Sequence, residues 1–161
     1  MIYLGGFLVC VGLIAAALYF QYVMHLEPCP LCILQRVCVI GTGLVLLVGA
    51  LHNPGVKGQR VYGGLTVLTA GLGAGVAGRH YWIQHLPFDQ QPGCSYDLSY
   101  MLEKFAITKM LKLVLQGSGD CAQVTWTFLG LSMPGWTLVF FMGFVGLGLM
   151  MIFSPVGKRR H

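Results

Sequence analysis

The chain has 161 residues, of which 56% are hydrophobic and only 9% are charged. A soluble domain carries about 25% charged residues, so a chain this apolar cannot cover its own surface in water. This composition excludes a soluble globular enzyme, a disordered protein and, despite the net charge of +5, a nucleic-acid-binding protein. The length allows one small domain.

Four apolar segments are long enough to cross a bilayer as helices, which takes about 20 residues each. They cover residues 2–24, 33–51, 61–80 and 135–153. The first lacks the basic start of a signal peptide, so we interpret it as a retained helix. Because the runs are continuous rather than alternating, a barrel is excluded. We predict an all-α membrane protein, a four-transmembrane-helix bundle that forms a single membrane domain over 1–161.

Basic residues between the predicted helices indicate the orientation in the membrane. The link 52–60 carries two of them and the tail 154–161 carries three, whereas the link 25–32 carries none. Positive residues near membrane ends stay in the cytoplasm. We therefore expect both termini in the cytoplasm and the links 25–32 and 81–134 on the outer side of the membrane.

The long outer link contains one segment with helical periodicity. Its apolar positions are Leu98, Met101, Leu102, Phe105, Leu111 and Val114. This spacing predicts a short amphipathic helix, either on the membrane surface or packed over the mouth of the bundle.

Glycines recur in the third and fourth apolar segments, at positions 71, 75, 143, 146 and 148. Small residues let helices approach closely in a membrane. We expect these glycines to mark tight helix packing.

The six cysteines fall into three pairs: Cys10 and Cys38, Cys29 and Cys32, Cys94 and Cys121. The first pair lies within predicted helices, where cysteine is commonly a small hydrophobic residue. The other two pairs lie in the outer links, where disulfides persist. These four cysteines are compatible with two structural disulfides, with one tetrahedral zinc site, or with redox activity.

The surroundings of Cys32 favour redox activity. Cys32 opens the second predicted helix, where unpaired N–H groups and the helix dipole stabilise a thiolate. Arg36 follows one turn deeper on the same face. An arginine at this depth can simply extend to the headgroups, but a dithiol beside a cation at the lipid boundary suits a hydrophobic electron acceptor. A quinone takes two electrons and two protons, and thiol–disulfide exchange can link the two outer pairs.

Several motifs together resemble the DsbB family of bacterial inner-membrane disulfide bond formation proteins. They are the segment 20–24 before the Cys-Pro-Leu-Cys of 29–32, the Gly-Asp-Cys-Ala of 119–122, Trp126, the Phe-Leu-Gly-Leu of 128–131, and the Met-Pro-Gly-Trp of 133–136. The resemblance covers essentially the whole chain.

The resemblance implies a role for each outer cysteine. Cys94 is attacked by a reduced periplasmic thiol oxidase of the DsbA type, and Cys121 is its partner. Cys29 and Cys32 reoxidise that pair, with Cys32 facing a membrane quinone, either ubiquinone or menaquinone. Arg36 matches the family's quinone-site arginine. No metal is expected in this site.

The family also has a quinone-site histidine near the outer end of the third helix. His80 and His85 are both candidates, and the position after Ile83 and Gln84 favours His85. Two alternative functions remain open: a quinone oxidoreductase like vitamin K epoxide reductase, and a non-catalytic membrane protein whose four outward thiolates bind zinc.

Overall fold

A computed structural model describes residues 2–25, 29–86 and 127–153. Its elements are α1 (Ile2–Tyr22), α2 (Pro30–His52), α3 (Val56–Gln84), β1 (Thr127–Phe128), β2 (Leu131–Ser132) and α7 (Met133–Phe153). The four helices are long and apolar enough to cross a membrane. A helix of 21 residues spans about 31 Å, which matches a bilayer core of about 30 Å. The predicted all-α bundle of four transmembrane helices is confirmed.

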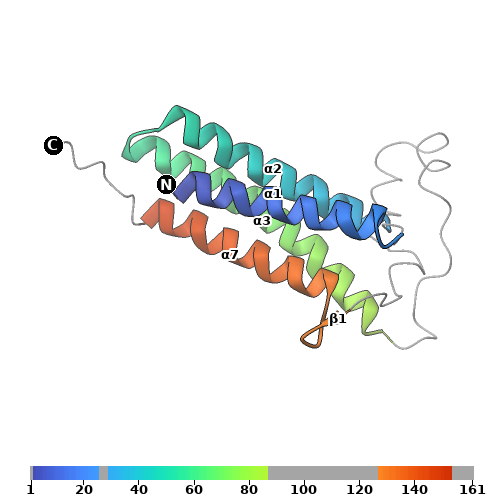
Figure 1. Ribbon diagram of the computed structural model, residues 1–161. Coiled ribbons are helices and arrows are strands. Elements are labelled where there is room, and N and C mark those ends of the chain that lie inside the picture. Colours follow the sequence, from blue (N-terminus) through green and yellow to red (C-terminus); the bar gives the residue numbers. More distant parts are fainter. Residues whose placement is uncertain (1, 26–28, 87–126, 154–161) are drawn as a thin grey trace, which may run out of the picture.

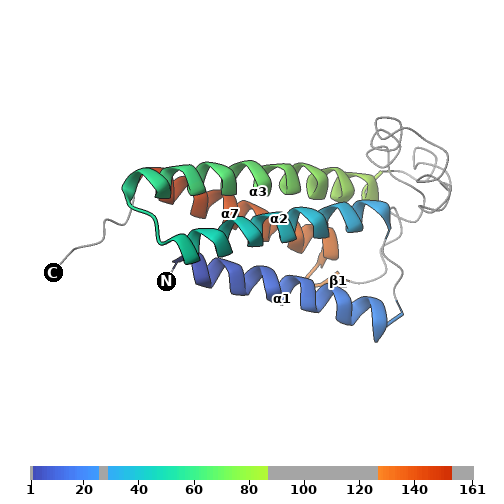
Figure 2. The same cartoon turned by 90° about the horizontal axis from the view of Figure 1, so that it is seen from above.

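The four helices lie side by side along one axis (Figures 1 and 2). The start of α1, the end of α7 and the link between α2 and α3 lie at one end of the bundle. The end of α1 and the start of α2 lie at the other end, together with the end of α3 and the start of α7. Cys29 and Cys32 lie at this second end, which we call the dithiol end.

Three helix starts differ from the sequence prediction, and the smallest difference is that of α7, which begins at Met133, two residues earlier than predicted. Helix α2 begins at Pro30, three residues earlier than predicted, with Cys29 at the N-cap. Proline is favoured at the first helical position because its missing N–H is not needed there. Cys32 therefore lies inside the first turn and does not open the helix. Helix α3 covers 56–84 rather than 61–80, because its polar ends extend beyond the apolar segment.

A short hairpin precedes α7, inside the range that the sequence analysis treated as a long link. Strands β1 and β2 pair antiparallel, and the two turn residues Leu129 and Gly130 have positive φ values of 53° and 81°. A two-residue turn with both φ positive is the one whose twist matches a hairpin. Ser132 donates a hydrogen bond to Gln84 Oε1 at 2.6 Å. The hairpin thus joins the start of α7 to the end of α3.

Helices α3 and α7 approach closely at two glycines. A Cβ on Gly63 would lie 2.8 Å from the carbonyl oxygen of Gly148, and a Cβ on Gly148 would lie 2.8 Å from that of Gly63. Gly73 makes room for the Phe141 ring in the same way. The prediction from the glycine pattern was therefore correct for Gly148 only. The glycines at 71, 75, 143 and 146 face open space.

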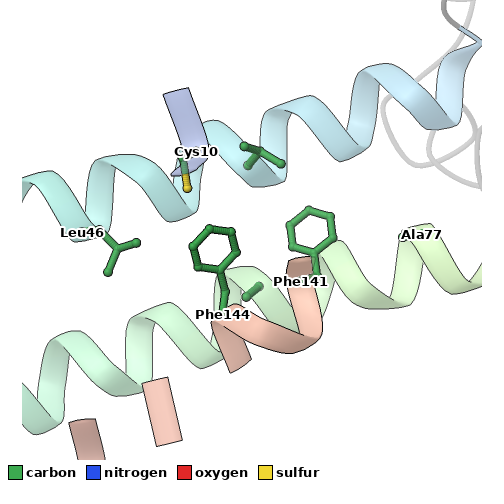
Figure 3. Close-up of a cluster of buried hydrophobic side chains, with 7 residues drawn as sticks. Cys10, Leu46, Ala77, Phe141 and Phe144 are labelled. Carbon is green, nitrogen blue, oxygen red and sulfur yellow. The ribbon is translucent and has the colours of Figure 1, made fainter. Parts of the chain in front are cut away.

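The middle of the bundle is an apolar core to which all four helices contribute (Figure 3). Its buried members are Cys10, Val39, Leu46, Ala70, Ala77, Phe141 and Phe144. Large apolar side chains also cover the outside of the helices, including Leu8, Leu68, Leu72 and Met150, each more than half exposed. An outside of this kind suits contact with lipid. The predicted amphipathic helix rests on residues 98–114, which lie outside the described part of the chain.

Candidate functional site

Cys29 and Cys32 form a compact pair of free thiols at the start of α2. Their sulfur atoms are 3.3 Å apart. Cys29 is buried at the N-cap, with 8% of its surface exposed, and Cys32 is partly exposed in the first turn. Unpaired N–H groups at a helix start favour negative charge. The fold therefore places both sulfur atoms at the positive end of the α2 dipole.

His80 from α3 lies against this pair. Its Nε2 is 3.7 Å from the Cys29 sulfur, and its Nδ1 is 3.9 Å from the Cys32 sulfur. The ring is only 2% exposed. A neutral imidazole offers one donor and one acceptor nitrogen. His80 is thus placed to exchange a proton with the dithiol.

The position of His80 follows from the buried face of α3. Buried residues recur on this helix at spacings of three and four: Gly63, Thr66, Ala70, Gly73, Ala77, His80 and Ile83. This spacing is the period of a helix packed into a bundle. His80 continues the row, and it is the row's first titratable side chain.

Gln35 and Thr137 hold the imidazole of His80 from the other side. Gln35 Nε2 lies 3.0 Å from His80 Nδ1, and the Thr137 hydroxyl donates to Gln35 Oε1 at 2.9 Å. Gln35 is only 4% exposed. A chain of hydrogen bonds therefore runs from α7 through α2 to α3 and ends at the two sulfur atoms.

This chain of hydrogen bonds can be satisfied in two ways. In the first, the Gln35 amide donates to Nδ1, so the imidazole proton is on Nε2 and faces Cys29. If the amide is turned over, its oxygen accepts a proton from Nδ1 and its nitrogen donates to Thr137. The Thr137 hydroxyl then donates to the carbonyl oxygen of Met133, which is 3.0 Å away. Because every buried group keeps a partner in both arrangements, His80 can change its tautomer at little cost.

Sequence reasoning did not single out Gln35 or Thr137. A signal for Gln35 was present: it lies three residues after Cys32, so both share one face of α2. A glutamine in an otherwise apolar run also requires a partner. No comparable signal marks Thr137, whose role depends on how α7 packs against α2.

Arg36 lies one turn deeper than Cys32 and is half-buried. Its guanidinium donates to the side-chain oxygen of Gln21 and, at 3.2 Å, to the backbone oxygen of Ala17. Both acceptors belong to α1. Arg36 therefore bridges α1 and α2 near the dithiol, and its charge is held within the bundle end.

His85, the histidine favoured from the sequence, is in a different environment. It caps the end of α3, is exposed, and its Nδ1 lies 2.9 Å from the backbone oxygen of Tyr81. The structure brings His80 to the dithiol instead. The physical reason is helix periodicity, because a residue five positions after His80 leaves the buried row. Binding of a quinone at His85 stays an untested prediction.

The remaining cysteines are separated from this cluster or undescribed. Cys10 is 3% exposed within the apolar core, and Cys38 packs against that core. Cys94 and Cys121 lie outside the described residues, so their roles stay predictions. Among described residues, Cys29, Cys32 and His80 form a group whose ligand atoms all lie within 4.8 Å of one another.

Comparison with known proteins agrees with this picture. The family model of Disulfide bond formation protein DsbB matches residues 1–151. Curated proteins named Disulfide bond formation protein B are similar to the chain along most of its length. The protein of Saccharophagus degradans is 53% identical over 140 residues, which cover 87% of this chain and 84% of that protein. The protein of Marinobacter nauticus is 53% identical over 153 residues, covering 95% and 91%.

The chain belongs to the DsbB family. A more distant relative from Xanthomonas campestris pv. campestris is still 44% identical over 159 residues, covering 98% of this chain and 92% of that protein. Membership in the DsbB family makes the protein a disulfide-forming oxidoreductase and a multi-pass protein of the bacterial inner membrane. The alternative of a protein like vitamin K epoxide reductase loses its support.

Proposed function

We propose that this DsbB-family protein reoxidises a periplasmic thiol oxidase of the DsbA type and reduces a membrane quinone. In the net reaction, a protein dithiol loses two electrons and two protons to become a disulfide, and the quinone becomes a quinol. Electrons pass first to the Cys94–Cys121 disulfide and then to the Cys29–Cys32 disulfide. The observation that carries the proposal is the dithiol of Cys29 and Cys32 against the buried His80.

The charges at the two ends of the bundle support a periplasmic dithiol. Lys57 and Arg60 are exposed at the end opposite Cys29 and Cys32. The positive-inside rule assigns that basic end to the cytoplasm. The dithiol end then faces the periplasm, where a secreted thiol oxidase can reach it.

His80 serves in this proposal as the proton carrier of the dithiol. Oxidation of Cys29 and Cys32 requires that both thiol protons leave, and only a thiolate attacks a disulfide or donates electrons readily. The Nε2 atom of His80 accepts a proton from the thiol of Cys29. The hydrogen bonds through Gln35 to Thr137 keep the ring in position in either tautomer.

The residues beside Cys32 fit a quinone. When bound, a quinone supplies a two-electron, two-proton acceptor that dissolves in the membrane. Cys32 is the more accessible sulfur, Arg36 supplies a cation one turn deeper, and the neighbouring Val37 is 57% exposed on the outer face of α2. The guanidinium orients the acceptor and stabilises negative charge that develops on its oxygen. Ubiquinone and menaquinone both satisfy this chemistry.

The proposal is tested by turnover in detergent. Purified protein is mixed with a reduced DsbA-type partner and a soluble ubiquinone analogue, and the loss of quinone absorbance is followed. We expect catalytic loss that requires both proteins and stops when Cys94→Ser removes the entry thiol. Full turnover in Cys29→Ser would show that electrons do not pass through this pair.

A non-catalytic zinc protein that uses all four outward thiolates is the remaining alternative. Elemental analysis of the protein as purified distinguishes the two. We expect the oxidoreductase to contain disulfides and no stoichiometric zinc, whereas zinc that resists mild chelation, together with four free outward thiols, would favour the alternative.

A further inference from the structure

The three potential metal ligands at the dithiol end have chemistry that the redox reaction does not use. Cys29, Cys32 and His80 supply two sulfur atoms and one imidazole nitrogen within 4.8 Å of one another. These ligand types together are those of zinc sites. We propose that the reduced form of the protein binds one Zn²⁺ ion at Cys29, Cys32 and His80, and that the bound ion blocks reoxidation.

The distances already approach those of a zinc site. With zinc bond lengths of about 2.3 Å to sulfur and about 2.0 Å to nitrogen, tetrahedral angles place two sulfur atoms about 3.8 Å apart and sulfur and nitrogen about 3.5 Å apart. The two sulfur atoms are 3.3 Å apart, and His80 Nε2 is 3.7 Å from the Cys29 sulfur. Because all three ligand atoms lie within 4.8 Å of one another, changes of at most about 1.3 Å in these separations close the site.

The charge balance favours a divalent ion at this depth. Binding releases one proton from each thiol, and the two thiolates cancel both charges of Zn²⁺, so the closed site is neutral. A neutral site avoids the large cost of burying a net charge. A monovalent ion on the same ligands would leave a net negative charge beside the membrane.

Gln35 supplies the outer support that a zinc-bound histidine requires. When Nε2 binds the ion, Nδ1 carries the ring proton, which metal-bound histidines commonly donate to an oxygen. Gln35 turned into its second arrangement places its amide oxygen 3.0 Å from Nδ1, and its nitrogen then donates to Thr137. The three described protein ligands leave one coordination position for water.

Zinc bound in this way competes with disulfide chemistry. A thiolate that holds the ion is not free to attack a disulfide or to donate electrons. Binding itself does not depend on the proposed function, whereas inhibition of quinone-linked turnover rests on it. Failure of the zinc-binding proposal can therefore be distinguished from failure of the proposed quinone-linked function.

Binding is measured on the full-length protein carrying Cys94→Ser and Cys121→Ser, so that the only outward thiols are Cys29 and Cys32. Zn²⁺ is titrated against a chromophoric chelator, first with reduced protein and then with the Cys29–Cys32 disulfide formed. We expect one ion per reduced protein and none per oxidised protein. Binding that disappears in this double variant would instead indicate a site shared by all four thiolates and would overturn the proposal.

Histidine variants test the third ligand. His80→Phe should weaken Zn²⁺ binding by more than tenfold, while His85→Phe, which changes an exposed histidine on the same helix, should leave the affinity unchanged. Gln35→Leu should weaken binding by about 10- to 100-fold through loss of outer support. Equal affinities in wild type and His80→Phe would exclude His80 as a ligand.

Two further readouts guard against a variant that fails to fold. Co²⁺ bound to the reduced protein in place of Zn²⁺ should give a thiolate-to-metal charge-transfer absorption that disappears on oxidation. This measurement needs no substitution in Cys29, Cys32 or His80. Zn²⁺ should also stop turnover of reduced protein, and a chelator should restore it. Absence of the absorption from reduced protein would contradict the site whatever the variants show.

Discussion

Two pairs of described cysteines lie in the same bundle but in opposite surroundings. Cys10 and Cys38 lie in or against the apolar core. Cys29 and Cys32 lie at a helix start, beside a buried histidine and a chain of hydrogen bonds. A thiol reacts as its thiolate, which apolar surroundings disfavour and positive or hydrogen-bonding surroundings favour. In the proposed function, the same residue type therefore packs the core in one region and carries the redox reaction in the other.

Removing either thiol of the dithiol end should have the largest effect. Cys29→Ser or Cys32→Ser leaves no disulfide to accept electrons, so we expect quinone-linked turnover to fall to background. The double variant Cys10→Ala with Cys38→Ala is the matched control and should turn over at the wild-type rate, with a loss of stability of about 1 kcal/mol per site. Turnover and the thermal midpoint measured together separate the two effects. Loss of activity in the control without unfolding would contradict the contrast drawn between the pairs.

His80→Phe should be the next most damaging change. The phenyl ring is close in size to the imidazole but cannot carry a proton, and positioned proton transfer contributes about 10²- to 10⁴-fold to a rate. We expect kcat to decrease by a factor of about 10² to 10⁴. The KM for the quinone analogue should change little.

His85→Phe provides the comparison on the same helix. Its side chain is exposed and bonded to its own helix backbone, so kcat should stay near that of the wild type. The opposite result, with His85→Phe inactive and His80→Phe active, would restore the assignment made from the sequence.

This pair of histidines shows which parts of the site a sequence can reveal. The four helices were predictable because about 20 apolar residues in a row have few other uses. The proximity of Cys29, Cys32 and Arg36 was predictable, because the three residues lie within eight positions of one another. The choice between His80 and His85 depends on which face of α3 is buried. The small residues Gly63, Ala70, Gly73 and Ala77 lie on that buried face, and the same spacing of three or four residues places His80 on it.

Other features depend on contacts between distant segments. Thr137 donates a hydrogen bond to Gln35, which is 102 positions away in the sequence, and no local sequence pattern predicts such a contact. The contact between Gly63 and Gly148 was equally hard to predict. Both helices contain several glycines, and the rotation of each helix about its axis determines which of them face the other helix. The early start of α2 was, by contrast, readable from Pro30, since proline is favoured at a first helical position.

Arg36→Gln should act mainly on the quinone. The substitution removes the charge, and a hydrogen bond to a charged group contributes about 1.5–3 kcal/mol, which corresponds to about a 10- to 100-fold rise in KM. Arg36→Lys keeps the charge but loses the planar fork of donors. Its KM should therefore lie between the KM of the wild type and that of Arg36→Gln. Initial rates are measured over a range of quinone-analogue concentrations at saturating partner. A KM in Arg36→Gln equal to that of the wild type would remove Arg36 from the acceptor site.

Thr137→Val should give the smallest effect and the sharpest test of the hydrogen-bond chain. Valine has nearly the same shape as threonine but cannot bond to Gln35, so the amide holds His80 less firmly. One neutral hydrogen bond contributes about 0.5–1.5 kcal/mol, which predicts a fall in kcat of about 2- to 10-fold with no change in KM for the quinone.

Thr42→Val is the control for this substitution, because the buried Thr42 also makes a side-chain hydrogen bond, to Thr69 in the middle of the bundle. Both variants lose a hydrogen-bonded hydroxyl, but only Thr137→Val should lower kcat. An equal decrease of kcat in Thr137→Val and Thr42→Val would mean that the bundle as a whole had loosened. A fall confined to Thr137→Val would mean that a residue on α7 acts on the dithiol through Gln35 and His80.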